Sequence, residues 1–251
     1  MYRIVSTVEA RIGSSRLPGK TMKQILGKPT LQLLLERLMR ARTIDQIVVA
    51  TTTNPEDDVI EEFCDSFAVS VFRGSSEDVL DRVEKAARES EADIVVEITG
   101  DCILTDPEVV DSAVKLFLNS DYDYISNLMM QTYPQGVDVR VFWYHHLKKI
   151  NEELAGDDPD AREHVTLYFE EHPELYKIFN MSAPQIYHYP EWRLDLDYEE
   201  DLKLLTIIFE GLYIKNREFT LKQLIDFLEK NQHLKKINCG AIRKPLRKEE
   251  K

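Results

Sequence analysis

The sequence is poor in cysteine, in long apolar runs and in net positive charge. Its 251 residues contain three cysteines, Cys64, Cys102 and Cys239, which are odd in number and far apart. Such spacing forms neither a disulfide framework nor a zinc site, which favours a reducing compartment. No apolar run approaches the roughly 20 residues of a membrane span, and the N-terminus lacks the regions of a secretory signal. We therefore expect a cytoplasmic protein without membrane association.

The charge balance is acidic, with a formal net charge of -13 at pH 7. Nucleic acids and membrane surfaces are polyanions, and this chain would repel them overall, so we expect neither as a partner. A small anionic ligand would need a local basic pocket. The sequence also contains neither G-x-S-x-G nor H-E-x-x-H, so acyl transfer and zinc hydrolysis lack support.

Strand-like and helix-like patterns alternate through the first half of the chain, as in βαβ units on a parallel sheet. The expected strands cover 2–8, 46–51, 69–72 and 93–99, and the expected helices include 30–42, 78–89 and 107–118. The pattern predicts an α/β fold with a Rossmann-like, mostly parallel sheet flanked by helices. With no repeat or linker, we expect one domain over 1–240 and a basic C-terminal tail over 241–251.

After residue 120 the alternation weakens. The segments DYISN and GVDVRVF, joined by the turn-rich YPQG, predict a small β excursion from the main sheet over about 122–142. Residues 143–172 are expected to be helical. Residues 192–196 are expected to form a late strand, and Thr220 with Gln223 predicts a capping box for the last helix.

The most informative segment is EARIGSSRLPGKTM, residues 9–22, directly after the first expected strand. It places Arg11, Arg16 and Lys20 on a turn rich in glycine and serine. Backbone N–H groups of such a turn can approach a ligand closely, while the cations neutralise its negative charge. The segment therefore predicts a binding site for a triphosphate.

Two other interpretations of this loop stay open. It nearly matches the Walker A pattern of P-loop enzymes, but one residue too many separates Gly13 from Gly19, and Pro18 lacks an N–H for a phosphate. It is also compatible with an ordinary surface turn whose charges are solvated.

Acidic residues follow two of the expected strands, at the edge where ligands collect in open α/β sheets. Asp101 follows the strand 93–99, while Asp195 and Asp197 are two apart on the late strand and would share a face. Mg²⁺ prefers one or two carboxylates together with phosphate oxygens, so these acids are candidate ligands. Alternatively, Asp101 is a turn residue and Asp197 an N-cap for the next helix.

The motifs ARIGSSRLPGK, ATTTNPEDD, FRGSSEDVLDR, ITGDCILTDP and LDLDYEEDL occur in this order. Together they resemble the cytidylyltransferases that make CMP-activated acidic sugars, and most of all the branch of spore-coat polysaccharide biosynthesis. The resemblance covers nearly the whole chain. It implies a Mg²⁺-dependent enzyme that transfers CMP from CTP to an acidic, nonulosonate-type sugar and releases pyrophosphate, in polysaccharide or glycan biosynthesis. We also expect a homodimer.

The resemblance assigns roles to individual residues. The catalytic residues would be Arg11, Arg16 and Lys20. The nucleotide would contact Ala10, Arg11, Gly13, Ser14, Ser15, Arg16, Lys20, Thr51, Thr52, Arg73, Gly74, Ser75 and Asp101. The metal would be held by Asp101, Asp195 and Asp197. The acceptor sugar would lie near Gln135, Asp138, Arg140, Arg162, Glu163 and His164, with Arg140 and Arg162 able to grip a carboxylate through two parallel hydrogen bonds.

The chain departs from its relatives at Glu9, where they commonly have glutamine, and this adds a negative charge beside the loop. Two alternatives to the transfer of CMP to an acidic sugar also stay open. One is transfer of CMP to a polyol phosphate or a phosphonate, and the other is a non-catalytic nucleotide-binding subunit.

Overall fold

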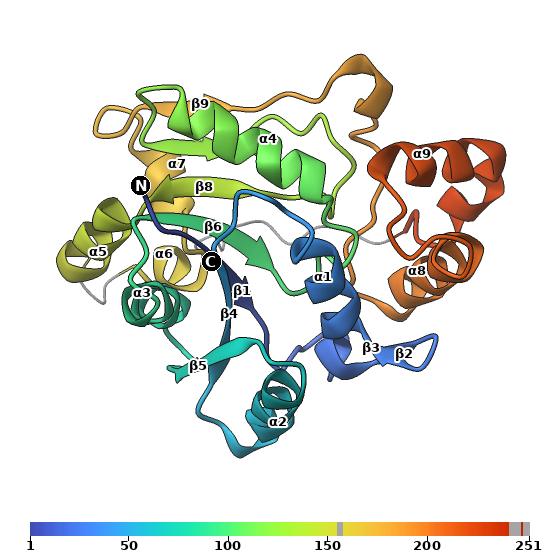
Figure 1. The fold of residues 1–251 in the computed structure, drawn as a ribbon, viewed down its shortest axis with the longest axis horizontal. Coiled ribbons are helices and arrows are strands. Elements are labelled where there is room, and N and C mark those ends of the chain that lie inside the picture. Colours follow the sequence, from blue (N-terminus) through green and yellow to red (C-terminus); the bar gives the residue numbers. More distant parts are fainter. Residues whose placement is uncertain (155–157, 241–246, 248–251) are drawn as a thin grey trace.

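The computed structural model describes residues 1–154, 158–240 and 247, and these build a central seven-stranded sheet of order β5-β4-β1-β6-β8-β7-β9 (Figure 1). The strands are β1 (Ile4–Glu9), β4 (Gln46–Thr52), β5 (Ser70–Gly74), β6 (Ile94–Thr99), β7 (Tyr124–Ser126), β8 (Arg140–Trp143) and β9 (Ile178–Asn180). β1 pairs in parallel with β4 and β6, whereas β8 is antiparallel to β6 and β7. The expected α/β fold with a mostly parallel sheet is confirmed.

Helices cover both faces of this sheet, because successive strand residues alternate between two apolar cores. Val8 of β1 lies in one core, and its neighbour on the opposite face, Val5, lies in the other. The first core is completed by α1 (Thr30–Leu38), α2 (Asp58–Ser66), α4 (Pro107–Leu118), α8 (Glu199–Leu212) and α9 (Leu221–Lys230). The second face carries α3 (Val79–Glu89), α5 (Tyr144–Glu153), α6 (Pro159–Glu163) and α7 (Leu167–Glu171).

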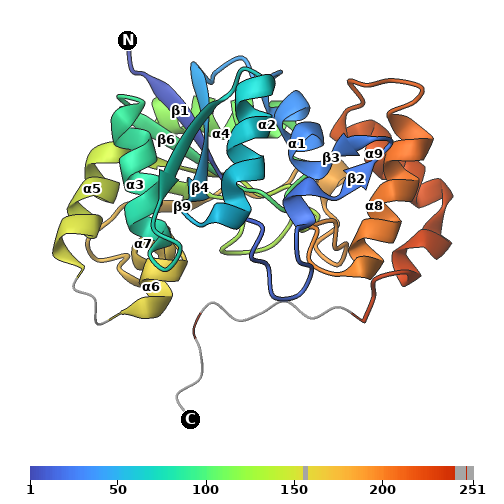
Figure 2. The same cartoon turned by 90° about the horizontal axis from the view of Figure 1, so that it is seen from below.

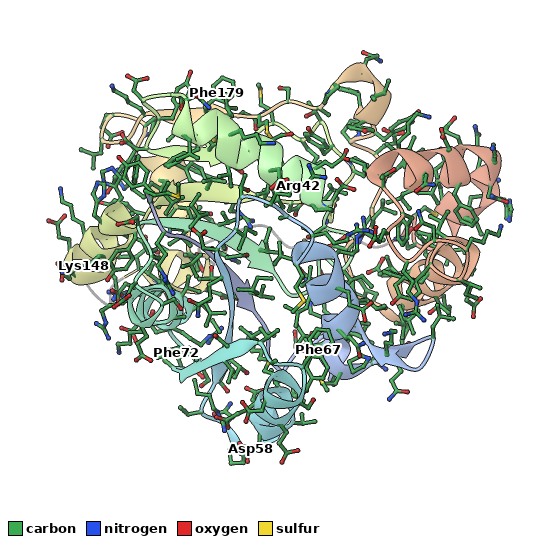
Figure 3. All side chains as sticks on the ribbon, viewed as in Figure 1. Arg42, Asp58, Phe67, Phe72, Lys148 and Phe179 are labelled. Carbon is green, nitrogen blue, oxygen red and sulfur yellow. The ribbon has the colours of Figure 1, made fainter. Side chains whose placement is uncertain are left out.

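The helix groups lie at opposite ends of the molecule when it is seen from below (Figure 2). There, α5, α6 and α7 are at one end and α8 with α9 at the other. Charged side chains such as Asp58 on α2 and Lys148 on α5 point outward at the periphery (Figure 3). No helix in the described part of the chain is long and apolar enough to cross a membrane.

Local signals set several helix starts, and one of them is the predicted capping box at Thr220. The Asp78 carboxylate accepts from Asp81 N at the start of α3, and Thr220 with Gln223 forms the capping box of α9. The shorter elements are η1 (Lys20–Met22), β2 (Gln24–Ile25), β3 (Lys28–Pro29), η2 (Pro55–Asp57), η3 (Gln185–Tyr187) and η4 (Gln232–Lys236).

The expected β excursion is instead part of the main sheet. Its two extended segments are β7 and β8, and β8 pairs with β6 through Val96↔Val141 and Glu97↔Arg140. The physical reason is that both faces of β8 are apolar, since Phe142 enters one core and Val141 the other. Strands covered on both sides belong inside a sheet rather than in a hairpin that leaves it.

The expected late strand is wrong. Residues 192–196, all of them described, form no strand and make a single parallel bridge, Gln135↔Arg193. Gly136 has φ +92°, and a Cβ atom there would lie 2.5 Å from Asp195 N, so the two segments are in close contact at this point. Without a strand, the argument that Asp195 and Asp197 share a face no longer holds.

The expected basic tail, 241–251, lies outside the described residues except for Arg247. The guanidinium of Arg247 forms ion pairs with Asp158 and Glu171.

Candidate active site

A cavity of about 470 Å³ lies at the carboxyl ends of β1 and β6. Segments from both halves of the chain form its wall. The lining residues are Glu9, Ala10, Arg11, Ser14, Ser15, Arg16, Lys20, Thr21, Val79, Arg82, Thr99, Gly100, Asp101, Cys102, Gln135, Asp138, Arg140, Glu163, His164, Asp195 and Asp197. This is the edge of the sheet at which ligands bind in open α/β folds.

The loop after β1 is closed on itself by backbone hydrogen bonds. The carbonyl oxygen of Ile12 accepts from Ser14 N at 2.7 Å and from Gly19 N at 2.9 Å. Gly19 has φ +67°, a left-handed conformation that glycine adopts without strain. The fully buried Asp57 anchors the loop, since its Oδ1 accepts from Ile12 N at 2.6 Å. Sequence reasoning missed Asp57, because an acid in the first turn of a helix is common for other reasons.

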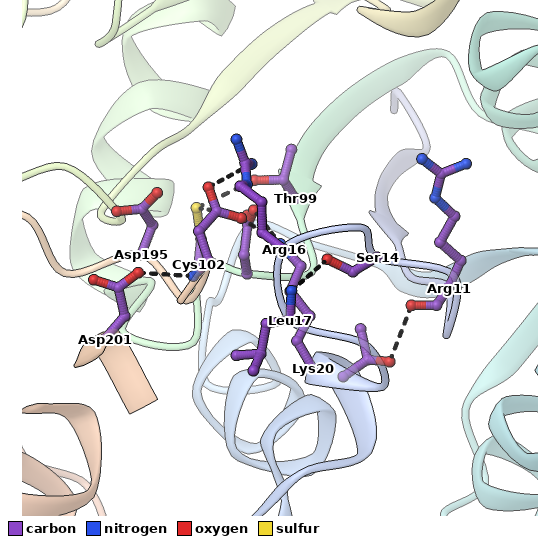
Figure 4. Close-up of polar contacts among 12 residues, drawn as sticks. Arg11, Ser14, Arg16, Leu17, Lys20, Thr99, Cys102, Asp195 and Asp201 are labelled. Carbon is purple, nitrogen blue, oxygen red and sulfur yellow. Dashed lines mark hydrogen bonds and ion pairs between the residues drawn. The ribbon is translucent and has the colours of Figure 1, made fainter. Parts of the chain in front are cut away.

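Lys20 connects this loop to both acidic segments. Its Nζ lies 2.8 Å from Asp101 Oδ2 and 2.8 Å from Asp197 Oδ1, while Arg16 Nη2 lies 2.6 Å from Asp197 Oδ2. Arg11 points away from this cluster, and Asp195 lies to its other side (Figure 4). The structure thus brings together four predicted site residues from three distant parts of the sequence.

The electrostatics keep these groups ionised. Burial disfavours the charged form of Asp101, but the neighbouring Lys20 ammonium outweighs it and lowers the pKa of Asp101 to about 2. Burial likewise opposes the charge of Lys20, and the two carboxylates nevertheless raise its pKa above the ordinary value. The pair is therefore charged across the physiological range.

Asp195 lies beside this cluster with different partners. Its Oδ2 accepts from Gln135 Nε2 at 3.0 Å, and its Oδ1 lies 3.2 Å from Arg193 Nε. Burial, and next the negative charge of Asp101, raise the pKa of Asp195 to about 7. Within 1–154, 158–240 and 247, no three His, Cys, Asp or Glu side chains gather closely enough to hold a metal ion. The two carboxylates that share the Lys20 ammonium are Asp101 and Asp197.

Five of the six residues predicted for the acceptor line the cavity, namely Gln135, Asp138, Arg140, Glu163 and His164. Arg140 is largely buried, with Nε 3.5 Å from Glu97 Oε2. Burial opposes its charge, but Glu97 and other acids raise the pKa of the Arg140 guanidinium, so the cation is retained.

Arg162 does not line the cavity among the described residues. Its Nη1 donates to Asn151 Oδ1 at 2.5 Å and lies 3.2 Å from Asp78 Oδ2, while Nη2 donates to Asn151 O at 2.9 Å. These contacts tie α6 to α5 and to the start of α3. In this structure the Arg162 guanidinium is occupied by protein groups.

The predicted nucleoside segments are also set back from the cavity. Thr51, Thr52, Arg73, Gly74 and Ser75 are not among the described residues of its lining, and neither is Gly13 of the predicted phosphate loop. The Thr52 hydroxyl donates to Asp57, and Arg73 pairs with Asp58 and Glu61 at 2.6 Å each. Ala10, Arg11, Ser14 and Ser15 do line the cavity.

Seven lining residues were not predicted as site residues: Glu9, Thr21, Val79, Arg82, Thr99, Gly100 and Cys102. Burial and then the neighbouring Glu97 raise the pKa of Glu9 well above its ordinary value, which favours its neutral form. Val79 and Arg82 are three apart on α3, a spacing that places both on one helix face.

A loop with fixed cations, opposed by two carboxylates in a cavity at the end of a parallel sheet, defines an α/β nucleotidyltransferase. The chain belongs to the cytidylyltransferase family, which it matches over residues 5–237. The family expected from the sequence is confirmed.

Two relatives and one solved structure illustrate the family. The chain is 32% identical over 237 residues to the spore coat polysaccharide biosynthesis protein SpsF of Bacillus subtilis, covering 92% of this chain and 96% of that protein. It is 29% identical to the 3-deoxy-manno-octulosonate cytidylyltransferase of Pelobacter propionicus, covering 95% and 86%. A cytidylyltransferase structure from Leptospira borgpetersenii superposes with a TM-score of 0.88 at 32% identity, covering 97% and 100%.

Proposed function

We propose that this enzyme transfers CMP from CTP to an acidic, nonulosonate-type sugar and releases pyrophosphate, with Mg²⁺ as cofactor. The observation that supports this most is the convergence of Arg16 and Lys20 with Asp101 and Asp197 in one cavity. Two relatives, one named for an acidic sugar and one for polysaccharide biosynthesis, support the choice of acceptor.

The residues present fit a divalent cation. The ammonium of Lys20 lies between Asp101 and Asp197 at 2.8 Å from each, so the two carboxylates already stabilise positive charge at one position. Mg²⁺ favours a site with one or two carboxylates, completed by phosphate oxygens and water. Asp101 and Asp197 would hold it, with Asp195 beside them. When bound, Mg²⁺ supplies Lewis-acid polarisation of phosphoryl oxygens.

The protein's own groups bind and orient the reactants. In the proposed reaction a sugar hydroxyl attacks the α-phosphorus of CTP, a new P–O bond forms, and the bond to pyrophosphate breaks. Little covalent chemistry is left to the protein, so positioning and charge neutralisation supply the catalysis. Lys20 and Arg16 would stabilise the leaving pyrophosphate, and the closed loop after β1 would present its backbone N–H groups.

A homodimer in the cytoplasm remains part of the proposal. The three cysteines are free thiols, which is consistent with a reducing compartment. Light scattering on the purified chain measures the oligomeric state directly.

Nucleotide selectivity gives the first test. CTP with Mg²⁺ should raise the melting temperature more than ATP, GTP or UTP, because a ligand that binds only the folded state stabilises it, by about 2.7 kcal/mol at 100 times Kd. Scanning fluorimetry measures the shift, and Lys148→Ala on the exposed face of α5 should respond like the unmodified enzyme. Equal shifts from all four nucleotides would remove the cytidylyl assignment.

Acceptor recognition gives the second test, with Arg140 and Arg162 as a matched pair. Arg140→Lys keeps the charge opposite Glu97 but loses the fork that grips a carboxylate, so we expect the acceptor KM to rise roughly 10-fold or more. Arg162→Lys should leave the acceptor KM unchanged and lower the melting temperature, because its partners are Asn151 and Asp78.

The readout is pyrophosphate release with a panel of acceptors. We expect turnover with nonulosonate-type acids and little with neutral sugar phosphates. A preference for a polyol phosphate or a phosphonate would instead favour the first alternative acceptor class.

A further inference from the structure

Arg193 lies behind the acidic side of the cavity, among three carboxylates. Its Nη2 is 3.3 Å from Asp195 Oδ2, 3.3 Å from Asp197 Oδ2 and 3.4 Å from Asp201 Oδ2. The Arg193 side chain is only 10% exposed. It is not among the described residues that line the cavity, so any effect on a bound ligand would pass through the aspartates.

Asp201 and Asn238 hold this guanidinium in place. The fully buried Asp201 accepts through Oδ2 from Asp197 N at 3.0 Å and Tyr198 N at 2.8 Å. Its Oδ1 accepts from Asn238 Nδ2 at 2.8 Å, and the same amide donates to Arg193 O at 3.0 Å. The backbone and the carboxylate of Asp197 are therefore both tied to the Arg193 and Asp201 pair.

The charged groups around Arg193 indicate what this arrangement does. Asp201 is fully buried and pairs with Arg193, while Asp101 and Asp197 pair with the loop cation Lys20 and Asp197 also pairs with Arg16. If those cations turn towards a triphosphate, the carboxylates must stay ionised and correctly aimed without them. A guanidinium is planar and donates in fixed directions, so it can hold two carboxylates in one orientation.

We propose that Arg193, held by Asp201 and Asn238, is a positioning residue that keeps Asp195 and Asp197 oriented towards the divalent cation. This inference rests on the proposed function. It also gives the segment after α9, through Asn238, a role in supporting the active site. Groups that orient metal ligands typically affect metal affinity 10- to 100-fold when they are removed.

The test compares three variants. Arg193→Gln removes the positive charge, and Arg193→Lys keeps the charge but loses the planar guanidinium. Asn238→Ala removes the amide that donates to Arg193 O and to Asp201 Oδ1. Arg217→Gln, on the exposed turn after α8, is the control. Mn²⁺ binding to the full chain with CTP is measured by the electron paramagnetic resonance of free Mn²⁺. Pyrophosphate release is followed as a function of Mg²⁺ concentration, and the melting temperature is recorded for each variant.

We expect Mn²⁺ to bind roughly 10- to 100-fold more weakly to Arg193→Gln, with a smaller loss in Arg193→Lys and Asn238→Ala. The Mg²⁺ concentration for half-maximal rate should rise in parallel, while kcat at saturating Mg²⁺ should fall less. The acceptor KM should not change. If Arg193→Gln does not fold, the other two variants carry the same comparison.

A lower melting temperature with unchanged Mn²⁺ binding and Mg²⁺ dependence would overturn the inference and leave Arg193 a purely structural residue. A failure of the proposed function would give a different experimental result. In that case the unmodified chain with CTP would bind no Mn²⁺ and release no pyrophosphate, whatever the variants do.

Discussion

Replacing Asp101 or Asp197 with asparagine should lower pyrophosphate release from CTP by roughly 10³-fold or more, since a bound metal supplies several kcal/mol and each 1.4 kcal/mol is tenfold in rate. Asparagine keeps the shape and one acceptor oxygen but removes the charge. Both carboxylates lie 2.8 Å from the Lys20 ammonium, so both are already placed around one cation.

The structure also rules out the alternative role predicted for Asp197, which was that of an N-cap for α8. The acid that binds the free N–H groups at the start of α8 is Asp201, which accepts from Asp197 N and Tyr198 N. Asp197→Asn should therefore leave the helix start and the fold intact, while the lost ion pairs with Arg16, Lys20 and Arg193 lower the melting temperature. Asp226→Asn, on the exposed face of α9, is the matched control. Retained activity in both Asp101→Asn and Asp197→Asn would rule out the proposed metal site.

Lys20→Ala should lower kcat/KM for CTP by roughly 10² to 10³-fold, the scale of losing one fixed donor to a charge that develops during the reaction. The ammonium is largely buried and held by two carboxylates, so little reorganisation is needed when phosphate binds. Arg16→Ala should act in the same direction, because Arg16 also lines the cavity.

Lys23→Ala provides a stringent control for Lys20→Ala. Lys23 lies three residues further on, pairs with Glu199 at 3.0 Å and is not among the described residues of the cavity. It should keep kcat/KM near that of the unmodified enzyme. Activity close to normal in both Lys20→Ala and Arg16→Ala would instead mean that the loop is an ordinary turn.

The melting temperature separates catalysis from stability in these variants. Lys20→Ala leaves Asp101 and Asp197 partly buried without their cation, which costs stability. A variant that unfolds below the assay temperature would explain a loss of activity without any role in catalysis. Activity is therefore compared well below each variant's own transition.

Sequence alone determined the elements whose signals are local. The alternation of strands and helices in the first half of the chain and the capping box at Thr220 depend on residues within a few positions of one another, and the structure confirms both. The loop carrying Arg16 and Lys20 was also visible, because glycine, serine and fixed cations after a strand form a pattern that needs no distant partner.

Tertiary structure alone decided which side chains face the cavity. Arg140 and Arg162 are equally plausible in sequence, but Arg140 is the first residue of the sheet strand β8, which begins at the cavity, whereas Arg162 contacts Asn151 and Asp78. The expected strand over 192–196 failed for a related reason, since a strand requires a neighbour to pair with, and here only one bridge forms.

The roles of Asp57 and Asn238 likewise could not be predicted from the sequence. Asp57 anchors the loop from 45 positions away, and Asn238 reaches Asp201 from 37 positions away. Their roles depend on the distance between atoms that the fold brings together, and hydrophobic periodicity, caps and turn residues encode only what lies nearby in the chain. An aspartate that aligns a loop, caps a helix or holds a cation is the same residue in sequence, and only its buried partners separate these roles.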